Sequence, residues 1–113
     1  MRAQLDPVVC IPSCEDQDGH PAALFAEDQI CFGKAMTVAL SQEEPERSGD
    51  QERAAYVDTY TQHHPGGQLS VHLYATTARD DMWLDLTAAE ALKLADNLIA
   101  VAALVRIDAE AIR

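Results

Sequence analysis

The sequence is poor in aromatic residues, in basic residues and in long apolar runs. Only 5% of its 113 residues are aromatic, and nineteen of its hydrophobic residues are alanines. Because alanine buries little area, we expect a thin hydrophobic core. Homodimerisation is one way to compensate, and Val101 and Leu104 lie where a second copy can cover them. The alternative is that these two residues pack under the N-terminal segment of the same chain.

Basic residues are also scarce. Eight lysines and arginines stand against nineteen acids, which gives a net charge of −11, and the bases form no cluster. Binding to a nucleic-acid backbone or to an anionic membrane surface requires a basic patch, so the sequence argues against both. The excess acid fits simple solubility, docking onto a basic protein partner, or mimicry of nucleic acid.

Targeting and membrane segments are also lacking. No apolar run reaches the eighteen residues that a transmembrane helix needs, and the first residues lack the basic start and apolar centre of a signal peptide. Three cysteines, an odd number, do not suit a secreted disulfide framework. These features predict a cytoplasmic protein.

What the chain does contain predicts a single α+β domain. An irregular segment over residues 1–29 precedes an antiparallel meander of about four strands, and one long C-terminal helix is expected to pack on the apolar face of that sheet. Residues 41–53 are highly charged and predict a flexible, solvated loop. The expected strands are residues 30–40, 54–61, 68–76 and 82–86, with a hairpin loop at 62–67 and a helix over 87–108.

The strongest local signal is the start of the C-terminal helix. Thr87 stands where an N-cap is needed, and Glu90 follows three residues later, as in a capping box. An amphipathic pattern continues from there, with acids and Lys93 on one face. The apolar face comprises Ala88, Ala91, Leu92, Ala95, Leu98, Ile99, Ala102 and Val105.

One group of residues has side chains that can bind a metal ion. Three thiols and one imidazole occur within the first 31 residues, and such a set can close a tetrahedral zinc site. A bound metal also orders a segment that has little apolar content of its own. The alternative is three incidental thiols and a loop histidine, and the nearby acids Asp16 and Asp18 oppose thiolate formation. The candidate ligands are Cys10, Cys14, His20 and Cys31.

The order of these motifs resembles a set of small actinobacterial or actinophage proteins that have no assigned activity. Those proteins open with a Cys-Pro-x-x-Cys-like knuckle and two histidines, and they close with strands and a Leu-Thr-x-x-Glu-Ala helix. Cys31 stands roughly where the second histidine falls, and Cys-Ile-Pro replaces Cys-Pro, so the resemblance implies a Cys3His zinc site and no particular function. The matching residues are Cys10, Cys14 and His20 at the front and Leu86, Thr87, Glu90 and Ala91 at the back.

A second group of residues alternates along the expected strands, opposite the apolar ones. Tyr56, His72, Tyr74 and Trp83 are expected on one face of the sheet. They form either ordinary cross-strand contacts or a binding face.

The sequence contains no nucleophile elbow, phosphate loop, dinucleotide fingerprint or metalloprotease motif. Its leading interpretation is a regulatory or adaptor protein with a structural zinc ion, acting through protein–protein interaction. The alternative is a small-molecule-binding or enzymatic domain that uses the outer face of the sheet.

Overall fold

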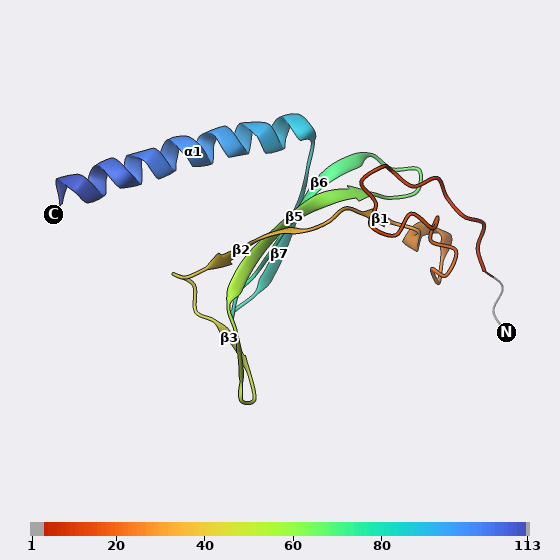
Figure 1. Cartoon of the computed structure of the whole chain (residues 1–113), viewed down its shortest axis with the longest axis horizontal. Helices are drawn as coiled ribbons and strands as arrows, with labels where there is room; N and C mark the ends of the chain where they lie inside the picture. Colours follow the sequence, from red (N-terminus) through yellow and green to blue (C-terminus); the bar gives the residue numbers. More distant parts are fainter. Residues whose placement is uncertain (1–3, 113) are drawn as a thin grey trace.

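The computed structural model describes residues 4–112, which form an antiparallel sheet, a small separate hairpin and one long helix (Figure 1). The α+β class and the irregular N-terminal segment predicted from the sequence are confirmed. The elements are a 3-10 turn (Ala26–Asp28), strands β1 (Cys31–Phe32), β2 (Met36–Leu40), β3 (Glu46–Ser48), β4 (Gln51–Arg53), β5 (Ala55–His63), β6 (Leu69–Thr76) and β7 (Asp81–Leu86), and helix α1 (Ala88–Ala111).

The main sheet is a meander built around β5. Strands β1 and β2 pair along one edge of β5, β6 pairs along the other, and β7 follows β6, all antiparallel. The hairpin between β5 and β6 is tighter than expected, since β5 continues through His63. Gly66 supplies the positive φ of 71° that this turn requires.

The first expected strand is in fact two short strands. Residues 33–35 interrupt it, although both halves pair with β5. The break begins at Gly33, whose N–H donates to the Thr61 carbonyl at 2.8 Å. A side chain at Gly33 would overlap the Thr61 hydroxyl, so only glycine allows this close approach.

The charged loop over residues 41–53 contains a hairpin that the sequence did not predict. Its strands β3 and β4 pair with each other and, within residues 4–112, with no other strand. Gly49 turns the chain with a φ of 61°, and Arg47 pairs with Glu52 at 3.4 Å across the hairpin. The hairpin depends on local turn chemistry and cross-strand pairing rather than on an apolar core, so apolar alternation could not indicate it.

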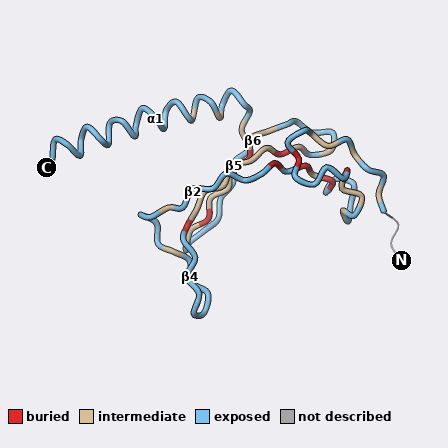
Figure 2. Tube along the Cα trace, viewed as in Figure 1, coloured by how far each residue is buried: buried red, intermediate tan, exposed pale blue. Residues whose placement is uncertain are grey.

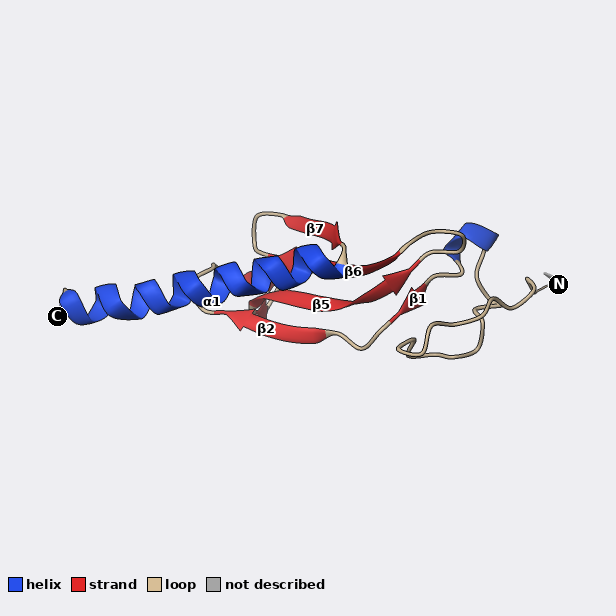
Figure 3. Ribbon diagram, turned by 90° about the horizontal axis from the view of Figure 1, so that it is seen from above, coloured by secondary structure: helices blue, strands red, loops and turns tan. Residues whose placement is uncertain are grey.

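Helix α1 forms as predicted but does not pack on the sheet. The capping box is present: Glu90 N–H donates to the Thr87 hydroxyl at 3.1 Å, and Thr87 N–H donates to the Glu90 carboxylate at 2.8 Å. Only the first turns approach β6 and β7, and no residue of α1 is buried. Figures 1 and 3 show the helix running over the sheet and far beyond it. The expected packing fails because Thr87 alone links β7 to α1, which leaves no loop for the helix to fold back.

The two faces of the sheet differ sharply. We call them the aromatic face and the apolar face, and they follow from the register, since residues opposite each other share a face. The aromatic face carries Tyr56, Asp58, Tyr60, His72, Tyr74, Thr76, Asp81, Trp83 and Asp85, and the apolar face carries Met36, Val38, Val57, Val71, Leu73, Ala75, Met82, Leu84 and Leu86.

The chain is extended and has little interior. Its radius of gyration is 18.5 Å, against about 13 Å for a compact domain of this length. Figure 2 shows the buried positions scattered along the N-terminal segment and the central strands, with α1 exposed or half-buried throughout. The buried hydrophobic residues are Cys14, Cys31 and Ala55. No large apolar side chain of residues 4–112 is fully buried.

Candidate metal centre

All four candidate ligands meet at one point beside β1. The sulfur atoms of Cys10, Cys14 and Cys31 and a ring nitrogen of His20 all lie within 4.8 Å of one another. His20 Nε2 is 3.3 Å from Cys14 Sγ and 3.4 Å from Cys31 Sγ. Tetrahedral zinc, with bonds of about 2.3 Å to sulfur and 2.0 Å to nitrogen, separates neighbouring ligand atoms by about 3.5–3.8 Å. The cluster therefore has the size and composition of a four-ligand metal site.

The backbone around the cluster bends through three residues with positive φ. Gln17 and His20 both have φ of 55°, and Gly19 between them has φ of 75°. A Cβ atom on Gly19 would lie 2.5 Å from the Pro7 Cβ and 2.8 Å from the Val8 carbonyl oxygen. This tight bend brings His20 back toward the cysteines that precede it.

Backbone N–H groups point at the sulfur atoms. The Gly19 N–H donates to Cys10 Sγ at 3.3 Å. Burial raises the pKa of the Cys14 thiol, but hydrogen bonds from the backbone at Gln17 and Asp16, with help from Cys31 and His20, outweigh it and lower that pKa to about 6. Such N–H···S bonds are usual around metal-bound thiolates.

Cys31 behaves in the opposite way. Burial and the neighbouring thiols raise its pKa to about 11. Three thiolates packed this closely repel one another in a buried setting, so a negative charge on Cys14 keeps the proton on Cys31. A divalent cation at the centre removes this conflict, because it stabilises every thiolate at once.

Two of the acids that seemed to oppose thiolate formation orient His20. The Nδ1 atom of His20 lies 3.5 Å from Asp18 Oδ1 and 3.9 Å from Asp16 Oδ2, while Nε2 faces the sulfurs. The backbone N–H of His20 also donates to Asp18 Oδ1 at 2.9 Å. A carboxylate on the far nitrogen of a ligating histidine fixes the ring and strengthens its donor atom.

Two glutamines that the sequence did not single out position the loop. Gln29 is 4% exposed, and its amide donates to the carbonyls of Asp6 at 2.8 Å, His20 at 3.1 Å and Gly19 at 3.3 Å. Gln17 does the same for the knuckle, donating to the carbonyls of Ile11, Pro12 and Cys14. Gln29 is buried and Gln17 is exposed, and neither glutamine has a sequence signature, so nothing in the composition or spacing indicates these roles.

Gln29→Leu is expected to weaken metal binding. The substitution keeps the volume but leaves buried carbonyls without a donor, at a cost of about 1–3 kcal/mol. We expect zinc affinity, measured by chelator competition, to fall about 10- to 100-fold, the usual range for groups that support metal ligands. Gln68→Leu, at an exposed position, is the matched control and should leave the affinity unchanged. Equal affinities in the two variants would contradict this role for Gln29.

The aromatic face forms three cross-strand rows, each with an aspartate and an aromatic or imidazole ring. The register aligns Tyr56, Thr76 and Asp81 in the first row, Asp58, Tyr74 and Trp83 in the second, and Tyr60, His72 and Asp85 in the third.

These rows place all four residues predicted for this face together. The rings of Tyr56 and Tyr74 are 6.3 Å apart, Trp83 lies opposite Tyr74 and is 62% exposed, and His72 Nδ1 bonds Asp85 at 2.7 Å. The sequence did not indicate that Asp81 and Asp85 share this face.

The aspartates change the titration of the tyrosines beside them. The hydrogen bond to Asp81 raises the pKa of Tyr74. Burial raises the pKa of Tyr60, with the charges of Asp58 and Asp85 adding to it. Hydrogen bonds from Thr76 and Tyr74 lower the pKa of Asp81. These shifts in pKa favour a charged Asp81 beside neutral Tyr60 and Tyr74.

Comparison with known proteins adds no family. The chain matches no protein-family model, no curated protein and no solved structure at a significant level. Within residues 4–112, no helix has the length and apolar character needed to cross a membrane.

Proposed function

We propose that this protein is a small regulatory or adaptor protein that acts through protein–protein contact, with a structural zinc ion ordering its N-terminal segment. The observation that carries the proposal is the meeting of Cys10, Cys14, His20 and Cys31 within 4.8 Å. Soft thiolate ligands with one imidazole suit zinc. Four protein ligands leave no open position for a substrate, which suits a structural ion. Free thiols of this kind persist in a reducing compartment such as the cytoplasm.

The aromatic face is the surface we assign to the partner. Trp83 is its most exposed ring, and Asp81 and Asp85 flank it at the adjacent positions on the same face of β7. A guanidinium group can stack on the indole and pair with either carboxylate. Together with the net charge of −11, this supports a basic protein segment, rich in arginine, as the partner.

The alternative, a small-molecule-binding or enzymatic domain on this face, has less support. A cavity on this face has as its lining residues Thr37, Ala39, Arg53, Ala54, Tyr56 and Asp58. His72 and Trp83, the residues expected to carry such a function, do not line that cavity. A shallow surface with paired acids and rings serves contact with a peptide better than it serves capture of a metabolite.

The test uses zinc-loaded protein as bait in native extract with chemical cross-linking. We expect a basic protein to be captured, its cross-links to fall on β6 and β7, and its capture to weaken as salt rises from 0.05 to about 0.5 M. Trp83→Ala should abolish the capture, whereas Leu24→Ser, at an exposed position in the N-terminal segment, should not. Capture that is equal for the two variants, or recovery of no protein above the control, would contradict the proposed function.

A further inference from the structure

The chain leaves far more surface exposed than a protein of its mass normally does. Its accessible surface is 8932 Å², whereas a folded monomer of 12.3 kDa exposes about 6,100 Å². The excess is about 2,800 Å² per chain, or about 5,600 Å² for two chains. Obligate homodimers bury about 2,000–5,000 Å² or more in total. The excess area is therefore large enough to supply the interface of an obligate homodimer.

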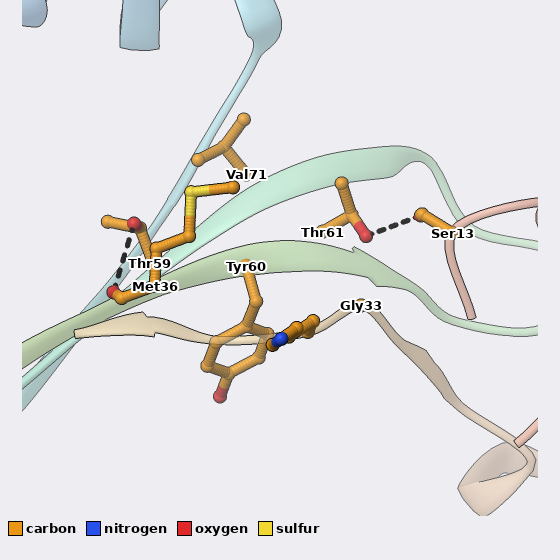
Figure 4. A pocket seen from close by; sticks show the side chains of 8 residues that line it. Ser13, Gly33, Met36, Thr59, Tyr60, Thr61 and Val71 are labelled. Atoms are coloured by element: carbon orange, nitrogen blue, oxygen red, sulfur yellow. Dashed lines mark hydrogen bonds between the residues drawn. The ribbon is translucent and has the colours of Figure 1, made fainter. Parts of the chain in front are cut away.

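The apolar face of the sheet supplies part of this surface. Its cross-strand rows contain no charged residue: one row joins Val38, Val57, Ala75 and Met82, and the next joins Met36, Thr59, Leu73 and Leu84. Met36 is 75% exposed. In Figure 4 the side chains of Met36 and Val71 lie on one side of the sheet, and Tyr60 points to the other.

This face is also hollowed. Where β1 and β2 separate, a cavity of about 370 Å³ opens on this face (Figure 4). Its lining residues are Ser13, Gly33, Lys34, Met36, Thr59, Tyr60, Thr61 and Val71, of which Lys34 is the one charged residue. Its lining is almost entirely apolar, so it suits an aliphatic side chain from outside the sheet.

Helix α1 supplies another part of the exposed surface. Ala91 and Leu94, in its first turns, are half-buried beside the sheet. The seam that they begin continues through Leu98, Val101 and Val105 at alternating spacings of three and four residues, which is the spacing of a helix-packing seam. Leu98 is 61% exposed. Beyond Leu94 the helix thus presents an apolar seam whose side chains are all exposed.

The same chain leaves this gap open. Thr87 alone connects β7 to α1, and it is held in the capping box with Glu90, so this capped junction sets the direction of the helix. A second copy can lay its helix on the apolar face without any change at this junction, and that helix has the required dimensions. Twenty-four helical residues span about 36 Å, and the nine residues of β5 span about 30 Å.

We infer that the apolar face of the sheet and the seam of α1 form a two-fold homodimer interface, in which α1 of each copy packs on the apolar face of the other. Because neither surface carries a charge at its centre, two chains of net charge −11 can meet there without burying like charges. The arrangement is isologous, since each copy gives one helix and accepts one. It goes beyond the proposed function, because it uses the face opposite the aromatic one.

The test is the mass in solution of the zinc-loaded full chain, measured by light scattering at about 20 μM. We expect twice the 12.3 kDa of one chain. Val38→Glu and Leu98→Glu each place a carboxylate in the interface and should weaken the dimer at least 100-fold. The matched controls add the same charge next to these sites: Ala39→Glu on the other face of β2, and Asn97→Glu on the polar side of α1. Both controls should remain dimeric.

A second measurement does not depend on the folding of the charged variants. The otherwise unchanged chain carries a photo-cross-linking residue in place of Leu98, and copies labelled with heavy and light isotopes are mixed. We expect cross-links between heavy and light chains that join α1 to β2, β5 or β6. A monomer or a species larger than a dimer, cross-links confined to single chains, or dimer loss in the two controls would each overturn the inference. The zinc test and the capture test use other residues, so failure here is separable from failure of the proposed function.

Discussion

Cys31→Ser is expected to abolish stoichiometric zinc binding and to release the N-terminal segment, while the sheet stays folded. Cys31 is buried on β1 and joins the loop ligands to the sheet, so removing its sulfur leaves three ligands without an anchor. Structural zinc sites contribute about 10–16 kcal/mol of apparent binding free energy, most of which orders the surrounding chain. Losing one ligand should therefore have a larger effect than any surface substitution in this protein.

Amide hydrogen exchange is the measurement for this prediction. The Leu5 and Val8 N–H groups donate to the Pro21 and Gly19 carbonyls at 3.0 Å, and these bonds hold the segment together. We expect their protection to fall at least 100-fold in Cys31→Ser, equivalent to about 3 kcal/mol, with protection retained in β5 and β6. His20→Asn should behave alike, and His64→Asn, at an exposed turn position, is the control. Unchanged protection in Cys31→Ser without zinc would contradict a metal-ordered segment.

Gly19→Ala should weaken zinc binding nearly as much as the loss of a ligand. An alanine at φ of 75° is strained by about 1–2 kcal/mol. The new Cβ would also overlap Pro7 and the Val8 carbonyl, and overpacking of this kind adds about 1–3 kcal/mol. We expect zinc affinity to fall about 100-fold, because the bend that returns His20 to the cysteines can no longer close.

Gly49→Ala is the control that distinguishes the backbone strain at positive φ from the steric overlap of the new Cβ. Gly49 has a φ of 61°, and no atom lies within 4 Å of its added Cβ. This variant should loosen the β3–β4 hairpin by about 1 kcal/mol and leave zinc affinity unchanged. If Gly19→Ala bound zinc as tightly as Gly49→Ala, the close packing of Pro7 against Gly19 would have no role in the site.

The sequence predicted the strands and the helix well because those signals are local. Alternation marked β5, β6 and β7 to within two residues, and Thr87 with Glu90 marked the start of α1. The placement of the helix was wrong for a physical reason: an apolar seam shows that a helix will be covered but does not show which chain will cover it. Residue type alone was enough to group the candidate metal ligands, which are Cys10, Cys14, His20 and Cys31.

The supporting residues of the candidate site could not be predicted. Gln29 matters only because three carbonyls from distant turns converge on its amide, which depends on the folded path of the loop. Asp18 seemed unfavourable because sequence proximity to the thiols does not reveal that its carboxylate faces His20 Nδ1. Asp81 and Asp85 joined the aromatic face only through the register of β6 with β7.

We propose a separate role for each part of the chain: the Cys/His cluster orders the N-terminal segment against β1, the apolar face and α1 receive a second copy, and the aromatic face remains open to a basic partner. These roles use different residues, so each can be removed without the others. The cluster comes first, because a segment with so few buried apolar side chains gains little order from a hydrophobic core.

The most direct test is therefore the metal content of the wild-type protein purified without chelator. Elemental analysis should give close to one zinc per chain, and a thiol reagent should react with the three cysteines only after the metal is removed. Metal-free protein in which all three thiols react freely, and in which the Leu5 and Val8 amides are nevertheless protected, would contradict the account.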